Sequence, residues 1–90
     1  MEIIILDGKK MNSFDGTHDY LAKSLRLPQY YGRNLDALYD CLGESFSDDA
    51  IIILMNGGKM KSALGAYGDK LCRVLEDAMG ECGYTFTYRE

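Results

Sequence analysis

The run Ala50-Ile51-Ile52-Ile53-Leu54-Met55 is the strongest indication of how this chain folds, because it is apolar throughout and leads into Asn56-Gly57-Gly58. A similar run, Glu2-Ile3-Ile4-Ile5-Leu6, ends at Asp7-Gly8. Both runs are short, rich in β-branched residues and bounded by turn-forming residues, so each predicts a strand. Runs that are apolar on both faces favour the strands of a parallel sheet. Tyr84-Thr85-Phe86-Thr87-Tyr88 alternates with period two, which predicts a third strand at an edge.

Helical spacing fills the segments between these strands. A first helix is predicted between Ser13 as its N-cap and Pro28 as its end, with an apolar stripe of Phe14, His18, Leu21, Ala22 and Leu25. A second is predicted over residues 34–43, with Gly43 as its stop. Two more are expected over residues 59–64 and from Tyr67 to Gly80 or Gly83.

The resulting order is β-α-α-β-α-α-β. Strands separated by helical segments of this length should be parallel and joined by right-handed crossovers. We therefore predict an α/β fold with a three-stranded parallel sheet backed by about four helices. The 90 residues are enough for one such domain, over residues 1–90, and a second domain is not expected.

The composition favours a globular protein with basic partners. Hydrophobic residues make up 47% and charged residues 27% of the chain, an ordinary globular balance. Ten basic against fourteen acidic residues give a net charge of −4. That sign repels phosphate backbones and anionic membranes and attracts basic proteins. We expect no direct binding to nucleic acid or to a membrane.

The N-terminus and the cysteines indicate a cytoplasmic protein. Met1-Glu2-Ile3 has no basic region, and the apolar run that follows is too short for a signal peptide or a membrane span. The three cysteines are odd in number and show no CxxC spacing, which favours reduced thiols: Cys41, Cys72 and Cys82.

The segment Tyr30–Leu42 carries the strongest functional signal. Asn34 is a good helix N-cap, and three leucines recur behind it at helical spacing: Leu35, Leu38 and Leu42. Asp36, Tyr39 and Asp40 stand at i, i+3 and i+4, so they project together from another face of the helix. The acidic run continues through Glu44, Asp48 and Asp49, and no Lys or Arg stands between Arg33 and Lys59. An aromatic beside carboxylates is typical of a protein-binding surface.

The run Tyr30-Tyr31-Gly32-x-Asn34-Leu35-Asp36-Ala37-Leu38-x-Asp40-Cys41-Leu42 resembles the signature of the barstar family, the intracellular inhibitors of the extracellular ribonuclease barnase. The resemblance is specific over residues 27–42 and holds by pattern over the whole chain. It implies a barstar-like domain, no enzymatic activity and no cofactor. It also implies a 1:1 complex with a basic, extracellular-type ribonuclease, formed by a protein that we expect to be a monomer when free.

The resemblance further implies roles for individual residues. Asp40 is the implied central carboxylate in the catalytic cleft, and Asp36 engages a second basic group. Tyr30 packs on the mouth of the cleft, and Gly32 lets the backbone approach closely. The other implied partner-binding residues are Tyr31, Asn34, Leu35, Tyr39, Gly43 and Asp77.

Four of these residues have an alternative role that the sequence leaves open. Tyr31 and Leu35 could belong to the core, Asn34 could act chiefly as the helix cap, and Asp77 could be a solvated residue. The chain also departs from the family at Arg33, where barstar has an acidic residue, and at Tyr39, which replaces a tryptophan. These two departures predict a weaker negative field or a different target nuclease.

Two other classes of function, an enzyme and a protein-binding adaptor, can be compared with the sequence. An enzyme would need reactive groups, but His18 is the only histidine and lies on an apolar stripe, which indicates a buried, hydrogen-bonded residue. No His and Cys cluster predicts a metal site, and Asn56-Gly57-Gly58 lacks the spacing of a phosphate loop, so it predicts a turn. An acidic adaptor of the same fold, whose target is not a nuclease, remains the alternative, because an acidic face does not name its partner.

Overall fold

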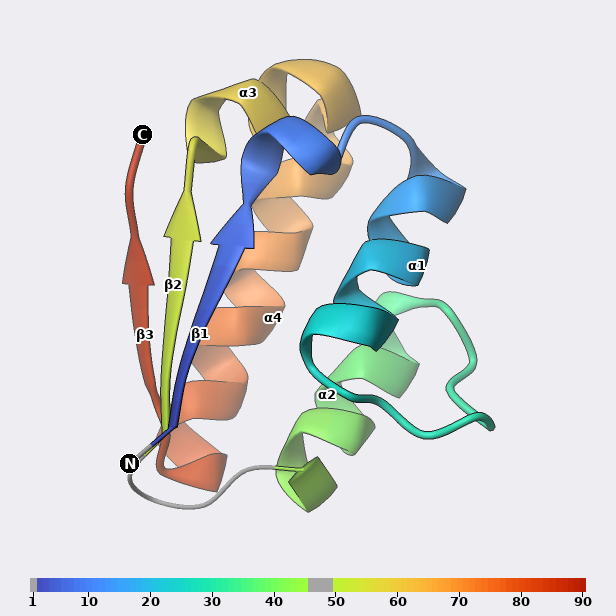
Figure 1. Ribbon diagram of the computed structural model, residues 1–90, viewed down its shortest axis with the longest axis vertical. Helices are drawn as coiled ribbons and strands as arrows, with labels where there is room; N and C mark the ends of the chain where they lie inside the picture. The colour runs from blue at the N-terminus through green and yellow to red at the C-terminus, as the bar shows by residue number, and fades with distance from the viewer. Residues whose placement is uncertain (1, 46–49) are drawn as a thin grey trace.

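The computed structural model describes residues 2–45 and 50–90. Within them lie the strands β1 (Glu2–Asp7), β2 (Ala50–Met55) and β3 (Thr85–Tyr88). A short 3-10 turn, η1 (Gly8–Lys10), follows β1. The α-helices are α1 (Phe14–Ser24), α2 (Leu35–Ser45), α3 (Gly57–Leu64) and α4 (Ala66–Cys82). The predicted order β-α-α-β-α-α-β and the α/β fold are confirmed (Figure 1).

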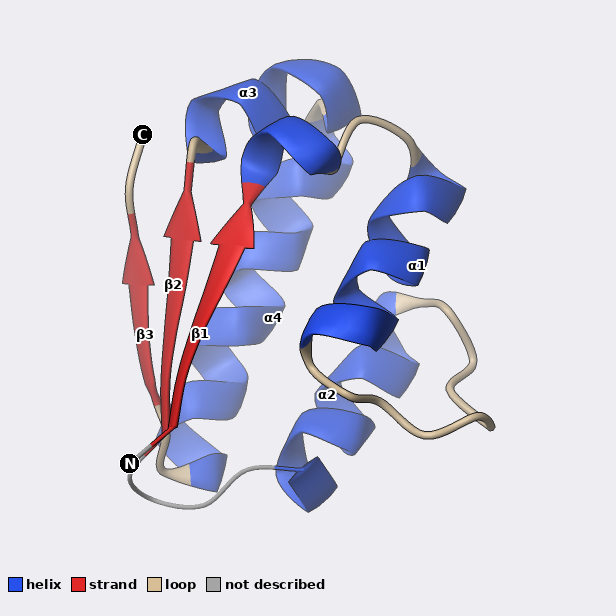
Figure 2. Cartoon of the chain, in the orientation of Figure 1, coloured by secondary structure: helices blue, strands red, loops and turns tan. Residues whose placement is uncertain are grey.

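The three strands form one parallel sheet with β2 in the middle. Ile4 of β1 pairs with Ile52 of β2, and Ile52 in turn pairs with Phe86 of β3. The predicted edge position of the third strand is therefore correct. Figure 2 shows the strands side by side, with the helices gathered to one side of them. The inward face of the sheet supplies part of the core through Ile4, Leu6, Ala50, Ile52 and Leu54.

The other face of the sheet is open, which the apolar runs did not predict. Ile3 and Ile5 on β1 are 54% and 57% exposed. The strand order explains this, because two right-handed crossovers that step across the sheet in the same direction place their helices on the same face. A second layer of helices would need a reversal of that direction, and the order β1-β2-β3 has none.

Several helix boundaries differ from the sequence prediction. α1 ends at Ser24, before the predicted end at Pro28. α2 continues through Gly43 to Ser45, so Gly43 is not its stop. Burial of Leu38 and Leu42 outweighs the cost of about 1 kcal/mol for a glycine inside a helix. α3 begins at Gly57 rather than at Lys59, because Asn56 adopts a left-handed conformation with φ of 57° and turns the chain directly into the helix.

Other local features agree with the prediction. The Ser13 side chain accepts a hydrogen bond from the Gly16 amide at 3.1 Å and so caps α1. Gly83 ends α4 in the left-handed conformation with φ of 89°. α2 packs against α4, whose inward residues Leu71 and Leu75 are fully buried. In the part of the chain described here, no helix has both the length and the apolarity that crossing a membrane requires.

Candidate partner-binding site

α2 presents its two carboxylates outward and its leucines inward. Asp36 and Asp40 are exposed, Tyr39 is half-buried, and Leu38 and Leu42 are fully buried. The i, i+4 spacing of the aspartates therefore places them on one open face of the helix, as the sequence predicts. No basic residue stands in the last turn of α2 to offset them. The side chain of Glu44 is not described, and Asp48 and Asp49 lie outside the described residues.

The start of α2 is fixed by Asn34. Its side-chain oxygen accepts a hydrogen bond from the Ala37 amide at 2.8 Å, and its side-chain amide donates to the Gly32 carbonyl at 3.3 Å. A Cβ atom on Gly32 would lie 3.2 Å from the Cβ of Ala37, tighter than most such contacts. Asn34 is therefore the helix cap, and it stays exposed beside Asp36. Leu35 is half-buried against the core.

The loop before α2 holds two neighbouring tyrosines that differ in exposure. Tyr30 is 74% exposed, whereas Tyr31 is only 7% exposed and belongs to the core. The Tyr31 amide donates to the Pro28 carbonyl at 3.0 Å, which closes a turn around the exposed tyrosine. The structure therefore separates two neighbouring residues that the sequence places together. Tyr30 is available for contact, and Tyr31 anchors the loop.

Tyr31 is anchored through His18, which is fully buried in α1. The Nδ1 atom of His18 lies 2.5 Å from the Tyr31 hydroxyl, and Nε2 lies 2.6 Å from the hydroxyl of Tyr67 in α4. The ring centroid of Phe14 is 4.9 Å from that of His18. Burial lowers the pKa of His18 below its ordinary value, as does the charge of Arg33 to a smaller extent. Burial also raises the pKa of the Tyr31 phenol.

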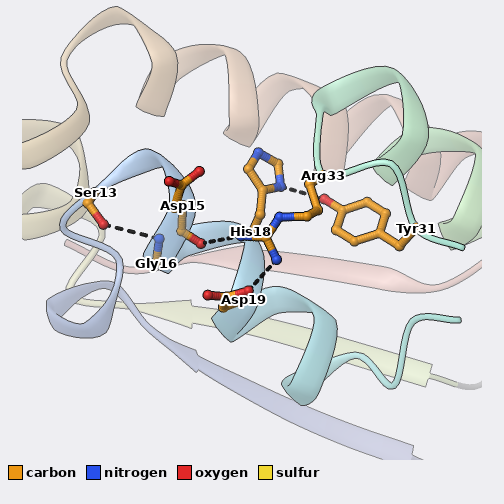
Figure 3. Close-up of polar contacts among 7 residues, drawn as sticks. All are labelled: Ser13, Asp15, Gly16, His18, Asp19, Tyr31 and Arg33. Carbon is orange, nitrogen blue, oxygen red and sulfur yellow. Dashed lines mark hydrogen bonds and ion pairs between the residues drawn. The ribbon is translucent and has the colours of Figure 1, made fainter. Parts of the chain in front are cut away.

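Arg33 is turned back onto α1 (Figure 3). It has a left-handed backbone with φ of 57°, and its guanidinium pairs with the Asp19 carboxylate. It also donates to the Asp15 carbonyl at 3.2 Å. The hydrogen bond from Arg33 lowers the pKa of Asp19. The basic residue that departs from the family pattern thus has its charge compensated by α1.

A pocket of about 260 Å³ adjoins the cap of α2. Its lining comes from three helices and the cap residue: Phe14, Asn34, Leu35, Asp36, Tyr67 and Lys70. A second pocket of about 390 Å³ lies by the carboxyl end of β1 and is lined by Gly8, Lys9, Asn12 and Lys59. The acidic residues of α2 do not line that second pocket.

The two remaining predicted site residues are also exposed. Gly43 lies on α2, and Asp77 lies on α4, the helix against which α2 packs. Among the described residues no group of three or more His, Cys, Asp or Glu is placed to hold a metal ion.

His18 and Tyr67 form the hydrogen bonds that anchor Tyr31, a role that the sequence did not predict for them. The sequence does predict a buried, hydrogen-bonded His18, which the structure confirms. It gives no sign of the Tyr67 contact, because that residue stands 49 positions away. The inward stripe also included Phe14, which is instead 48% exposed beside the pocket.

A three-stranded parallel sheet with helices on one face, one of which carries two exposed carboxylates, makes this a small α/β domain. Residues 1–88 match the family model described as "Barstar (barnase inhibitor)". A protein of Bacillus subtilis (strain 168) named "Putative ribonuclease inhibitor YrdF" is 38% identical over 81 residues, which cover 90% of this chain and 89% of that protein. The chain belongs to the barstar family.

Proposed function

We propose that this protein inhibits a barnase-type ribonuclease by covering its active site with α2 and the loop before it. The observation that carries the proposal is the exposure of Asp36 and Asp40 on one face of α2, together with the exposure of Tyr30 in the loop before that helix. A ribonuclease active site concentrates basic groups that hold RNA phosphates. Carboxylates presented at that spacing can take the place of the phosphates and exclude the substrate.

Each exposed residue has a proposed part in the complex. Asp40 enters the cleft, Asp36 meets a second cation, and Tyr30 packs on the rim. The proposed flanking residues are accessible or half-buried and come from the loop, α2 and α4: Gly32, Asn34, Leu35, Tyr39, Gly43 and Asp77. Tyr31 is buried, so its proposed part is to hold the loop in place.

The orientation of Arg33 supports this proposal. A cation between Tyr30 and Asp36 would repel a basic nuclease if it faced outward. Its guanidinium is instead paired with Asp19, which reduces its effect on the field of the acidic face. The proposed partner is a basic, extracellular-type ribonuclease bound 1:1, and the proposed compartment is the cytoplasm, where the inhibitor would protect the cell's RNA before the nuclease is exported.

The direct test is a titration of barnase activity with the purified protein. Inhibition should reach completion at one equivalent. A mononucleotide that occupies the nuclease active site should weaken the complex competitively, because both ligands use the same basic groups. Inhibition that the nucleotide leaves unchanged would place the contact elsewhere on the nuclease and would contradict active-site capping.

The alternative function is that of an acidic adaptor whose target is not a nuclease. One observation supports it: Tyr39 replaces the family tryptophan, and its smaller ring changes the shape of the face. An adaptor would leave barnase activity unchanged at any ratio. It would still retain a basic protein that is not a nuclease in a capture from native cells, and Asp40→Ala bait would lose that protein.

A further inference from the structure

Two neighbouring residues of α1 hold the loop that precedes α2. His18 bonds the hydroxyl of Tyr31 from inside the protein, and Asp19 pairs with Arg33 at the surface. Gly32 lies between Tyr31 and Arg33 and is exposed, as are Arg33 and Asn34. The turn that carries the proposed contact residues is therefore fastened to α1 at two points, Tyr31 and Arg33 (Figure 3).

The hydrogen bonds of His18 form a closed set. A neutral imidazole has one N–H donor and one nitrogen acceptor, while a tyrosine hydroxyl can fill either role. Both ring nitrogens lie within 2.6 Å of a tyrosine oxygen, and the ring has no exposed surface. The neutral ring thus satisfies both of its nitrogens and joins three parts of the chain: α1, the loop at Tyr31, and the first turn of α4 at Tyr67.

We propose that His18 is a positioning residue for the inhibitory loop, and that through Tyr31 it holds Tyr30 and Gly32 in the arrangement that the ribonuclease requires. This inference rests on the proposed function. His18 cannot touch a partner itself, because it is fully buried. Its effect on binding must come from the order that it imposes on the loop before the complex forms.

The physical basis is preorganisation. A loop that is already fixed in its bound form loses less conformational entropy on binding, so the complex is tighter. Within the loop, the turn from the Tyr31 amide to the Pro28 carbonyl is a local contact. The bond to His18 ties this turn to α1 in addition to the packing of the Tyr31 ring in the core. Without that bond, one of its two groups is left buried and unpaired: the Nδ1 atom of His18 when the hydroxyl is removed, or the hydroxyl when the imidazole is removed. Either case favours a loop that opens to water.

The test compares two deletions of a buried tyrosine hydroxyl. Tyr31→Phe removes the bond to His18. The matched control Tyr84→Phe removes the bond from the Tyr84 hydroxyl to the Leu75 carbonyl, which is 2.6 Å long and joins the residue before β3 to α4. Both variants should lose similar stability. Tyr31→Phe should weaken binding to barnase by about two- to tenfold, the equivalent of one hydrogen bond, while Tyr84→Phe should leave it unchanged. His18→Phe, which keeps a ring but removes both nitrogens, should weaken binding at least as much as Tyr31→Phe.

A second measurement needs no partner. In Tyr31→Phe, hydrogen exchange of the backbone amide at position 31 should accelerate by more than exchange at Ile52 in the central strand. In Tyr84→Phe, exchange at position 31 should show no such extra acceleration. Equal exchange at Tyr31 in both variants would overturn the inference, and so would equal affinity for barnase. If the wild-type protein does not bind barnase at all, it is the proposed function that fails, and the exchange measurement still decides whether His18 orders the loop.

Discussion

The guanidinium of Arg33 pairs with the carboxylate of Asp19, so the cation nearest the acidic helix in sequence is held by a different helix. The left-handed backbone of Arg33 turns its side chain toward α1, at a cost of roughly 1–2 kcal/mol for a residue with a Cβ atom. The contacts of the guanidinium with Asp19 and with the Asp15 carbonyl offset part of that cost.

This relationship predicts the effect of restoring an acidic residue at position 33. Arg33→Glu would face Asp19 with a second negative charge and change the net charge from −4 by −2 to −6. We expect a small loss of stability, because an exposed pair of modest value becomes a repulsion. Association with barnase should become faster at low salt, and dissociation should also become faster because the loop loosens. Stopped-flow kinetics would separate the two rates.

The matched control is the charge swap Arg33→Glu with Asp19→Lys, which keeps the net charge at −4 and allows a reversed pair. Dissociation of the swapped variant should return toward the wild-type rate. If the single and double variants dissociate equally fast, the pair does not hold the loop.

Asp40 should contribute most of the binding energy among the exposed carboxylates. Removing a central carboxylate leaves cations of the partner buried and unpaired, so Asp40→Ala should weaken binding by about 2–5 kcal/mol. Stability should barely change or rise slightly, because the repulsion with Asp36 disappears. Asp69→Ala is the control, since this exposed carboxylate faces Lys61 of α3 at 3.5 Å. A change within about twofold for Asp40→Ala, or roughly 0.4 kcal/mol, would show that the site is assigned wrongly.

Stability should fall as the solution becomes mildly acidic, because of His18. Its pKa is lowered in the folded protein, so below the ordinary value of 6.5 the unfolded chain takes up a proton that the folded protein resists. The contribution of His18 is therefore complete above pH 6.5 and is lost as the pH falls toward the folded pKa. The slope is at most about 1.4 kcal/mol per pH unit for one proton.

The charged groups near His18 act in both directions. Arg33 disfavours its protonation, whereas Asp15 and Asp19 favour it more weakly than burial opposes it. Urea denaturation between about pH 7.5 and pH 5 would measure how the free energy of unfolding depends on pH. This range spans the ordinary pKa of histidine. His18→Gln should flatten the profile in that window, since His18 is the single histidine of the chain. An unchanged profile would mean that His18 titrates normally.

The thiols should be slow to react in the native protein. The side chains of Cys41 and Cys72 are only 5% and 6% exposed, and burial raises the pKa of Cys72. Since the thiolate is the reactive form, both effects slow labelling. Cys41→Ala should cost about 1 kcal/mol of stability through lost packing and leave barnase binding intact. The side chain of Cys82 is outside the described part of the structure. Its labelling rate can be compared with the rates of the two buried thiols. Rapid labelling of Cys41 and Cys72 in the absence of denaturant would contradict this assignment.

The sequence predicted what depends on local periodicity. The spacing of Asp36 and Asp40 is enough to place them on one face, and the apolar runs are enough to place β1 and β2 in the sheet. It could not predict contacts between distant segments, such as the bond from His18 to Tyr67 across 49 positions. Nor could it predict the direction of Arg33, which depends on a left-handed φ that an arginine rarely adopts.

The acidic run should act on the rate of association more than on the rate of dissociation. Opposite net charges attract over long distances in dilute salt, and screening shortens the Debye length from about 30 Å at 0.01 M to about 10 Å at 0.1 M. Association with barnase should therefore be fast at low salt and slow steeply across that range. Dissociation should change little, because close contacts in a desolvated cleft are poorly screened. Stopped-flow measurements across the same range give both rates.

A variant with Glu44, Asp48 and Asp49 made neutral provides the comparison, since these charges follow Asp40 in sequence but are not proposed to enter the cleft. It should associate more slowly than the wild type, show a weaker dependence on salt and dissociate at nearly the same rate. An association rate that does not respond to salt would mean that the negative charges are only solvated, and capping of a basic active site would lose its electrostatic support.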